Sequence, residues 1–131
     1  MIVLDTHVLI WWLAGGKLSS KAQKIINKFA GKERSILVSS ISAWEMAMLV
    51  DHGRLVLTMD VETWLETAKK IPSIQFVPID NSIAIQSTRL PGDFHRDPAD
   101  RMLVALARHW SAPIVTADEK ILAYKYVKAV W

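Results

Sequence analysis

Short, unbroken runs of apolar residues alternate along the chain with segments that carry apolar side chains at helical spacing. The apolar runs predict buried strands over residues 1–4, 35–39, 74–79, 113–116 and 126–131. The i, i+3, i+4, i+7 spacing of an amphipathic helix occurs at residues 22–29 and again at residues 103–110. Further helices are predicted over residues 6–14, 42–52 with Gly53 as the stop, 60–70 and 81–90.

Apolar strands that alternate with helices are typical of a parallel sheet covered on both faces. The pattern therefore predicts an α/β fold, in which a short parallel sheet of four or five strands is flanked by helices. No repeat, linker or low-complexity stretch divides the sequence, so we expect residues 1–131 to form a single domain. Open parallel sheets bind ligands at the carboxyl ends of their strands, and functional side chains are expected there.

Composition excludes several classes of function. Hydrophobic residues make up 51% of the chain and charged residues 22%, which is sufficient for a core and far from the disordered class. The absence of cysteine excludes disulfide scaffolds, thiolate zinc sites and cysteine catalysis, and it favours a reducing, cytoplasmic location. The longest apolar run, residues 8–16, is shorter than the roughly 20 residues that cross a bilayer, so no membrane segment is expected.

The net charge of +3 permits an anionic partner, and two groups of cations are candidates to bind one. Four lysines spaced 4, 3 and 4 residues apart fall within an arc of roughly 60° on one helix face, namely Lys17, Lys21, Lys24 and Lys28. They form either a solvated face or a rim that tracks a phosphate backbone. Arg96, Arg101 and Lys120 stand beside acidic residues in the sequence, where they would contact a phosphate or pair with carboxylates.

Carboxylates are concentrated where the carboxyl edge of the sheet is expected, at Asp5, Glu45, Asp97, Asp100 and Asp118. Each has a local explanation, because the aspartates stand at helix starts and residues 42–45 match the capping box S-x-x-E. Capping does not require a carboxylate at every such place, since serine, threonine and asparagine also cap. Crowded carboxylates repel one another unless a cation is present, and all-oxygen donors suit Mg²⁺ or Mn²⁺.

No other catalytic chemistry has a comparable signal. The four histidines lack any metal-ligand spacing, and only His95 is close to the acids in sequence. The chain has no glycine-rich phosphate loop and no G-x-S-x-G elbow.

Four motifs resemble those of PIN-domain ribonucleases, in particular the VapC-type toxins of toxin–antitoxin pairs. They are LDTHVLIWWL, SSISAWEMAM, FHRDPADRMLVALA and IVTADEKI, in the family's order and spacing over essentially the whole chain. The resemblance implies a PIN-like three-layer sandwich. It makes Asp5, Glu45, Asp100 and Asp118 the catalytic, metal-holding acids, and it leaves Asp97 open between ligand, orienting group and cap. Thr6 and Thr116 then match the hydroxyls that hydrogen-bond such carboxylates.

The resemblance also implies an activity and partners. The activity is that of a Mg²⁺-dependent endoribonuclease, with Mn²⁺ as a substitute, in which a metal-activated water leaves 5′-phosphate and 3′-hydroxyl ends. Either Glu45 or Asp100 would orient or deprotonate that water. The implied partners are an RNA substrate, a cognate VapB-like antitoxin and a second copy of the chain in a homodimer.

The first and third helices carry more apolar side chains than one internal face needs. They are Trp11, Trp12, Trp44, Met46, Met48, Leu49 and Val50. We assign Trp44 and about half of the others to the core, and expect the rest to form an exposed groove between these helices that receives an antitoxin segment.

Other classes fit less well. A receiver-like signalling domain needs paired acids after the first strand, and a haloacid-dehalogenase-like phosphatase needs D-x-D-x-T, whereas Thr6 and His7 follow Asp5. A non-catalytic metal or RNA binding module and a PIN-like nuclease acting on DNA or flaps remain as alternatives.

Overall fold

The sheet at the centre of the molecule contains five strands in the order β3-β2-β1-β4-β5, and all neighbours pair in parallel. The computed structural model describes all residues from Met1 to Trp131. The strands are β1 (Ile2–Leu4), β2 (Ile36–Ser39), β3 (Ile74–Val77), β4 (Ile114–Val115) and β5 (Ala129–Val130). The predicted α/β class with a short parallel sheet is confirmed.

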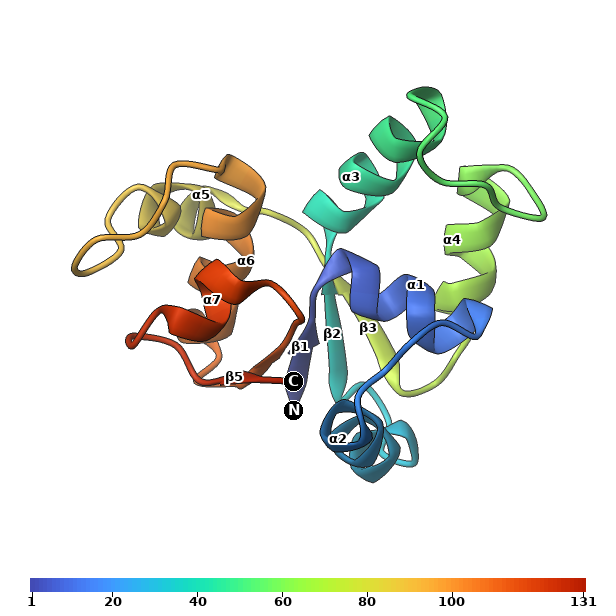
Figure 1. The fold of residues 1–131 in the computed structure, drawn as a ribbon, viewed down its shortest axis with the longest axis horizontal. Coiled ribbons are helices and arrows are strands. Elements are labelled where there is room, and N and C mark those ends of the chain that lie inside the picture. The colour runs from blue at the N-terminus through green and yellow to red at the C-terminus, as the bar shows by residue number, and fades with distance from the viewer.

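Seven helices surround this sheet. They are α1 (Thr6–Ala14), α2 (Ser20–Ala30), α3 (Ser40–Asp51), α4 (Val61–Lys69), α5 (Asn81–Ser87), α6 (Pro98–His109) and α7 (Glu119–Ala123). Figure 1 shows α1, α2 and α4 on one side of the sheet and α5, α6 and α7 on the other. No helix is long and apolar enough to cross a membrane.

The alternation of side chains along β1 divides the core into two layers. Ile2 and Leu4 pack with residues of α1, α2 and α4, whereas Val3, which points to the opposite face, packs with residues of α5, α6 and α7. All three side chains are fully buried. The chain therefore forms the three-layer sandwich that the continuous apolar strands predict.

Several predicted boundaries shift for local reasons. The strand predicted over residues 74–79 ends at Val77, because Pro78 has no N–H to continue the ladder. The last predicted strand is reduced to Ala129–Val130. The third helix begins at Ser40 and its N-cap is Ser39, so the capping box expected at residues 42–45 is wrong. Ser42 is instead buried inside the helix.

The lysines predicted to track a phosphate backbone lie on or before α2, away from the acids. Ser19 caps α2, so Lys17 precedes the helix and does not share its face. Ser35, which precedes β2, donates a hydrogen bond to the Phe29 carbonyl, so the last turn of α2 lies near the amino end of that strand (Figure 1), whereas the acids follow the carboxyl ends of the strands. Lys21, Lys24 and Lys28 are exposed there, as both interpretations of the lysines require, and contact with a phosphate backbone stays a prediction.

Substitutions of two helical isoleucines, one buried and one exposed, test where the core lies. Ile26 on α2 is completely buried, whereas Ile85 on α5 is 47% exposed. We expect Ile26→Ala to lower the free energy of unfolding by about 2 to 5 kcal/mol, because it leaves a cavity in the core. Ile85→Ala, the matched control, should change it by about 1 kcal/mol or less. Urea denaturation followed by circular dichroism measures both, and equal losses would contradict this assignment of the core.

Candidate active site

The sheet topology brings the predicted acids to one cavity at the carboxyl edge. Asp5 directly follows β1, Glu45 lies in α3, and Asp118 follows β4. Asp97 and Asp100 stand at the start of α6. All five line one open cavity of about 460 Å³, together with His7, Trp11 and Ala117. His7 was not expected in this position, although its separation of two residues from Asp5 was a signal available in the sequence.

Asp5 is the most enclosed of these carboxylates, with only 8% of the residue exposed. Its Oδ1 accepts a hydrogen bond of 2.7 Å from the Thr6 N–H, and its Oδ2 accepts one of 2.6 Å from Thr116 Oγ1. Burial raises the pKa of Asp5, and these two hydrogen bonds oppose that rise. Thr116 Oγ1 also accepts a 3.0 Å hydrogen bond from the Asp118 N–H, so a single hydroxyl joins two of the acids.

Glu45 is held by the other predicted threonine. Thr6 Oγ1 lies 2.8 Å from Glu45 Oε1 and 2.8 Å from Ser42 Oγ, which links the start of α1 to the middle of α3. Burial raises the pKa of Glu45, the Thr6 hydrogen bond opposes that rise, and the nearby Asp5 adds to it. The structure thus gives Glu45 a tertiary partner in place of the capping contact that its sequence motif suggested.

Asp97 and Asp118 do cap helices, as their positions predict. Asp97 Oδ1 accepts a 3.0 Å hydrogen bond from the Asp100 N–H at the start of α6. Asp118 Oδ1 accepts hydrogen bonds of 2.9 and 3.0 Å from the N–H groups of Lys120 and Ile121. In both residues the cap uses Oδ1 alone, so Oδ2 is left for another ligand.

Asp100 is repelled by each of the four other acids of the cavity. Burial, followed by the charges of Asp97 and Asp5 and then the other acids, raises the pKa of Asp100 to about 7. His95 Nε2 lies 2.9 Å from Asp100 Oδ2, and His95 is the only basic side chain within 4 Å of an acidic one in the molecule. That nitrogen forms no well-aligned hydrogen bond, so the two side chains are in contact without a formed hydrogen bond.

No lysine or arginine lies within ion-pair distance of any of these acids. Arg101, one of the cations expected to contact phosphate or to pair with carboxylates, pairs with none of the acids. Its Nε donates to Ser87 O at 2.7 Å, and its Nη1 donates to Phe94 O at 3.0 Å and His95 O at 3.2 Å. Arg101 therefore fixes the loop before α6, whereas Arg96 and Lys120 are exposed and remain available to a ligand.

The donor chemistry of the cavity fits a hard divalent cation, because five carboxylates face one space without a cationic partner. In this conformation, no three of the acidic or histidine side chains are grouped closely enough to hold one ion together. Carboxylates repel one another and a divalent cation reverses that repulsion, so we expect ion binding to draw these side chains inward.

The apolar groove differs from the predicted one in its position and its residues. It lies between α3 and α6 rather than between the first and third helices, with a volume of about 420 Å³. Trp44, assigned to the core from the sequence, is 55% exposed and lines this groove with Ile41, Met48 and Pro98. Glu45 and Asp97 line it as well, so the groove adjoins the acidic cavity.

A three-layer α/β sandwich with a carboxylate-lined cavity at the carboxyl edge of its parallel sheet defines the class of protein to which this chain is compared. Residues 2–126 match the PIN domain family, to which this chain therefore belongs. Ribonuclease VapC22 of Mycobacterium tuberculosis is 30% identical over 129 residues, which cover 98% of this chain and 95% of that protein. The resemblance to VapC-type PIN proteins is thus confirmed.

Solved structures share the fold over nearly their whole length. VapBC2 from Rickettsia felis, bound to a DNA fragment from its promoter, has a TM-score of 0.71 at 14% identity, covering 99% of this chain and 98% of that chain. A toxin–antitoxin complex from Klebsiella pneumoniae has a TM-score of 0.66 at 16% identity, with coverages of 100% and 97%.

The raised pKa of Asp100 predicts how stability depends on pH in buffer containing EDTA. An unfolded aspartate ionises near pH 4, whereas Asp100 in the folded protein ionises near pH 7. Between these values the unfolded state binds fewer protons at this residue than the folded state does. The contribution of Asp100 to the free energy of unfolding therefore falls as pH rises from 4 to 7. Asp100→Asn removes this loss, and we expect its melting temperature to exceed that of the wild type increasingly over this range.

Thermal melts at pH 4 to 8 measure the effect. Asp51→Asn, at the exposed end of α3, is the matched control and should leave the shape of the pH profile unchanged. Parallel profiles of the wild type and Asp100→Asn would contradict the raised pKa.

Proposed function

We propose that this protein is a metal-dependent endoribonuclease and the toxin of a toxin–antitoxin pair, with Mg²⁺ as its ion and Mn²⁺ as a substitute. The observation that carries the proposal is the convergence of five carboxylates on one cavity without a lysine or arginine partner. Helix capping alone does not explain this convergence, because Glu45 and Asp100 do not cap. Membership of the PIN family and the 30% identity to a VapC ribonuclease support the same proposal.

Asp5, Glu45, Asp100 and Asp118 would hold the ion, and the free Oδ2 of Asp97 is available as a fifth donor. When bound, a divalent ion lowers the pKa of water and offsets the charge of a scissile phosphate. Thr116 and Thr6 keep the carboxylates of Asp5 and Glu45 in fixed orientations through their hydrogen bonds.

Asp100 is the best candidate to take a proton from the attacking water. Its carboxyl pKa of about 7 shows that the cavity disfavours further negative charge, and a cation in the cavity would stabilise the ionised form. Ionised Asp100, with His95 Nε2 at 2.9 Å from its Oδ2, then has a neighbour to which that proton can pass. Water activated in this way makes the RNA 2′-hydroxyl unnecessary, so the products are 5′-phosphates and 3′-hydroxyls.

The antitoxin is proposed to cover the groove between α3 and α6. That groove presents the exposed Trp44 to an apolar side chain and ends at Glu45 and Asp97, where a basic side chain would be attracted. Toxin–antitoxin complexes among the solved structures of this fold support such a partner. A homodimer is proposed on the family resemblance.

The direct test is incubation of the purified protein with total RNA and Mg²⁺ or Mn²⁺, followed by analysis of the fragment ends. We expect cleavage that leaves 5′-phosphates and is abolished both by EDTA and by Asp5→Asn. Asp51→Asn should cleave as the wild type does. Cyclic 2′,3′-phosphate ends would refute the proposed mechanism, and equal cleavage of a matched DNA would favour the alternative of a DNA or flap nuclease.

The role of Thr116 gives a second test that does not depend on activity. Thr116→Val keeps the shape of the side chain but removes the hydroxyl that joins Asp5 to Asp118. We expect Mn²⁺ affinity, measured by calorimetry, to fall about 10- to 100-fold. Thr67→Val, whose hydroxyl bonds only to its own helix α4, is the control and should not alter it. Unchanged affinity in Thr116→Val would show that the carboxylates need no such support.

A further inference from the structure

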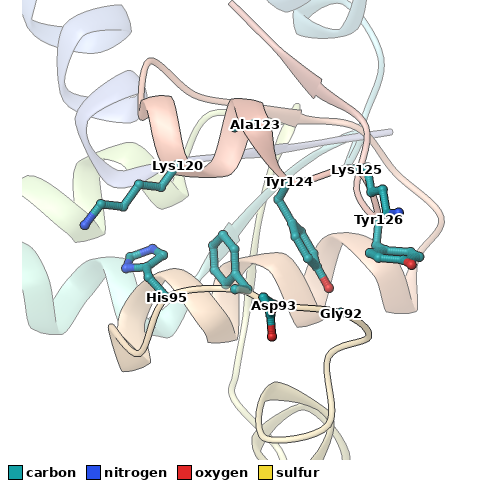
Figure 2. A pocket seen from close by; sticks show the side chains of 9 residues that line it. Gly92, Asp93, His95, Lys120, Ala123, Tyr124, Lys125 and Tyr126 are labelled. Carbon is teal, nitrogen blue, oxygen red and sulfur yellow. The ribbon is translucent and has the colours of Figure 1, made fainter.

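A second cavity lies beside the acidic one and has a different character. It has a volume of about 550 Å³ and is bounded by residues 92–95 before α6 and by residues 120–126 of α7 and the loop after it. Figure 2 shows Lys120 and His95 at one end of this pocket and Tyr124, Lys125 and Tyr126 at the other. The proposed chemistry of the acids uses none of Tyr124, Lys125 and Tyr126.

The floor of the pocket is a continuous row of aromatic rings. The ring centroids of Tyr126 and Tyr124 are 5.6 Å apart, those of Tyr124 and Phe94 are 4.7 Å apart, and those of Phe94 and His95 are 4.5 Å apart. His95 then contacts Asp100 in the acidic cavity. The row therefore runs directly from the exposed Tyr126 to the acids.

Hydrogen bonds from both sides hold this row in place. Arg101 donates to the carbonyls of Phe94 and His95, and the Tyr124 hydroxyl donates to the carbonyl of Pro91. Tyr124 is nearly buried, whereas Tyr126 is 39% exposed and forms the accessible end. The hydrogen bonds thus fix the loop at Phe94 and His95 and the ring of Tyr124, and they leave Tyr126 open to a ligand.

Gly92 is what allows the loop to lie against the ring of Tyr126. Its φ of +65° is in the left-handed region, and an added Cβ would come within 2.8 Å of Tyr126 Cε2. The close approach supports the edge of the ring and leaves no room for a side chain at this point.

Cations lie at both ends of the row. The Lys125 ammonium is 5.1 Å from the centre of the Tyr126 ring, and Lys120 is exposed next to His95. Asp93 is the only acidic side chain that lines the pocket. An exposed aromatic face with a lysine at each end of the row fits a flat, uncharged base in a single strand, whose sugar is linked to phosphates on both sides.

We propose that this pocket binds an unpaired base of the RNA substrate, one or a few nucleotides from the bond cleaved at the acids. The base stacks on Tyr126 and displaces the Lys125 ammonium, which then contacts a flanking phosphate, while Lys120 contacts a phosphate nearer to the acids. This inference rests on the proposed ribonuclease function and adds to it a binding site for one unpaired base beside the acids. A base in a duplex cannot enter, because it is already stacked and paired.

Binding measured without cleavage tests the pocket. The probes are fluorescently labelled 12-nucleotide RNAs of randomised sequence, an abasic ribose-phosphate chain of the same length and a 12-base-pair RNA duplex, all in EDTA. We expect Tyr126→Ala to raise the Kd for the single-stranded probe at least about 5-fold, and Tyr126→Phe to retain wild-type affinity. Tyr126→Ala and the wild type should bind the abasic chain with equal affinity, because it has no base. They should also bind the duplex with equal affinity, because its bases are not free.

The lysines have a separate readout. Lys125→Gln should lower the slope of log Kd against log salt by about 0.7, the loss of one phosphate contact with a single strand. Lys69→Gln, on the distant and exposed end of α4, is the control that leaves the slope unchanged. Thermal melts of the Tyr126 variants verify that each is folded.

The results separate this inference from the proposed function. If Tyr126→Ala binds the single-stranded probe with the same Kd as the wild type, the proposal that the pocket binds a base is wrong. This holds even if the protein cleaves total RNA with Mg²⁺. An equal loss of affinity for the abasic chain in Tyr126→Ala also overturns that proposal, because the ring would then be acting on the backbone or the fold. Failure of cleavage with intact, Tyr126-dependent binding would instead refute the nuclease proposal alone.

Discussion

Mutual repulsion among carboxylates at the end of the sheet is the constraint on which the rest of the structure depends. Five acids line one cavity, no lysine or arginine lies within ion-pair distance of them, and burial raises the pKa of Asp5, Glu45 and Asp100. The ionised cluster costs folding free energy. The buried threonine hydrogen bonds and the two apolar layers of the sandwich must offset that cost. A protein selected only for stability would not gather five carboxylates in one place.

Helix capping and metal binding are compatible uses of the same aspartates. Asp97 and Asp118 each cap with Oδ1, which fixes the side-chain torsions and leaves Oδ2 directed elsewhere. The helix N-terminus also favours the charged form of the carboxylate. The position that makes an aspartate a good cap therefore also makes it a fixed donor with one free oxygen, so capping and metal binding do not exclude each other.

The sequence predicts the sheet and the acids well because both depend on local patterns. Continuous apolar strands imply a parallel sheet, and residues that follow parallel strands meet at one edge whatever the details of packing. The errors concern the direction in which helical side chains point. Trp44 and Ser42 lie on α3, whose orientation depends on tertiary contacts such as the link from Thr6 to this helix. No spacing rule within one helix contains that information.

Arg101 shows how one side chain couples the two cavities. A cation beside several acids would be expected to pair with them, yet its guanidinium donates to Ser87, Phe94 and His95 carbonyls, where three neutral acceptors satisfy it. Pairing with the acids would neutralise the charge that attracts a divalent ion. Binding the loop instead leaves that charge intact and fixes both His95, which faces Asp100, and Phe94, which continues the aromatic row. The acidic cavity and the aromatic pocket are therefore positioned by the same three hydrogen bonds, so a substrate strand that spans them meets two sites held in a constant relative position.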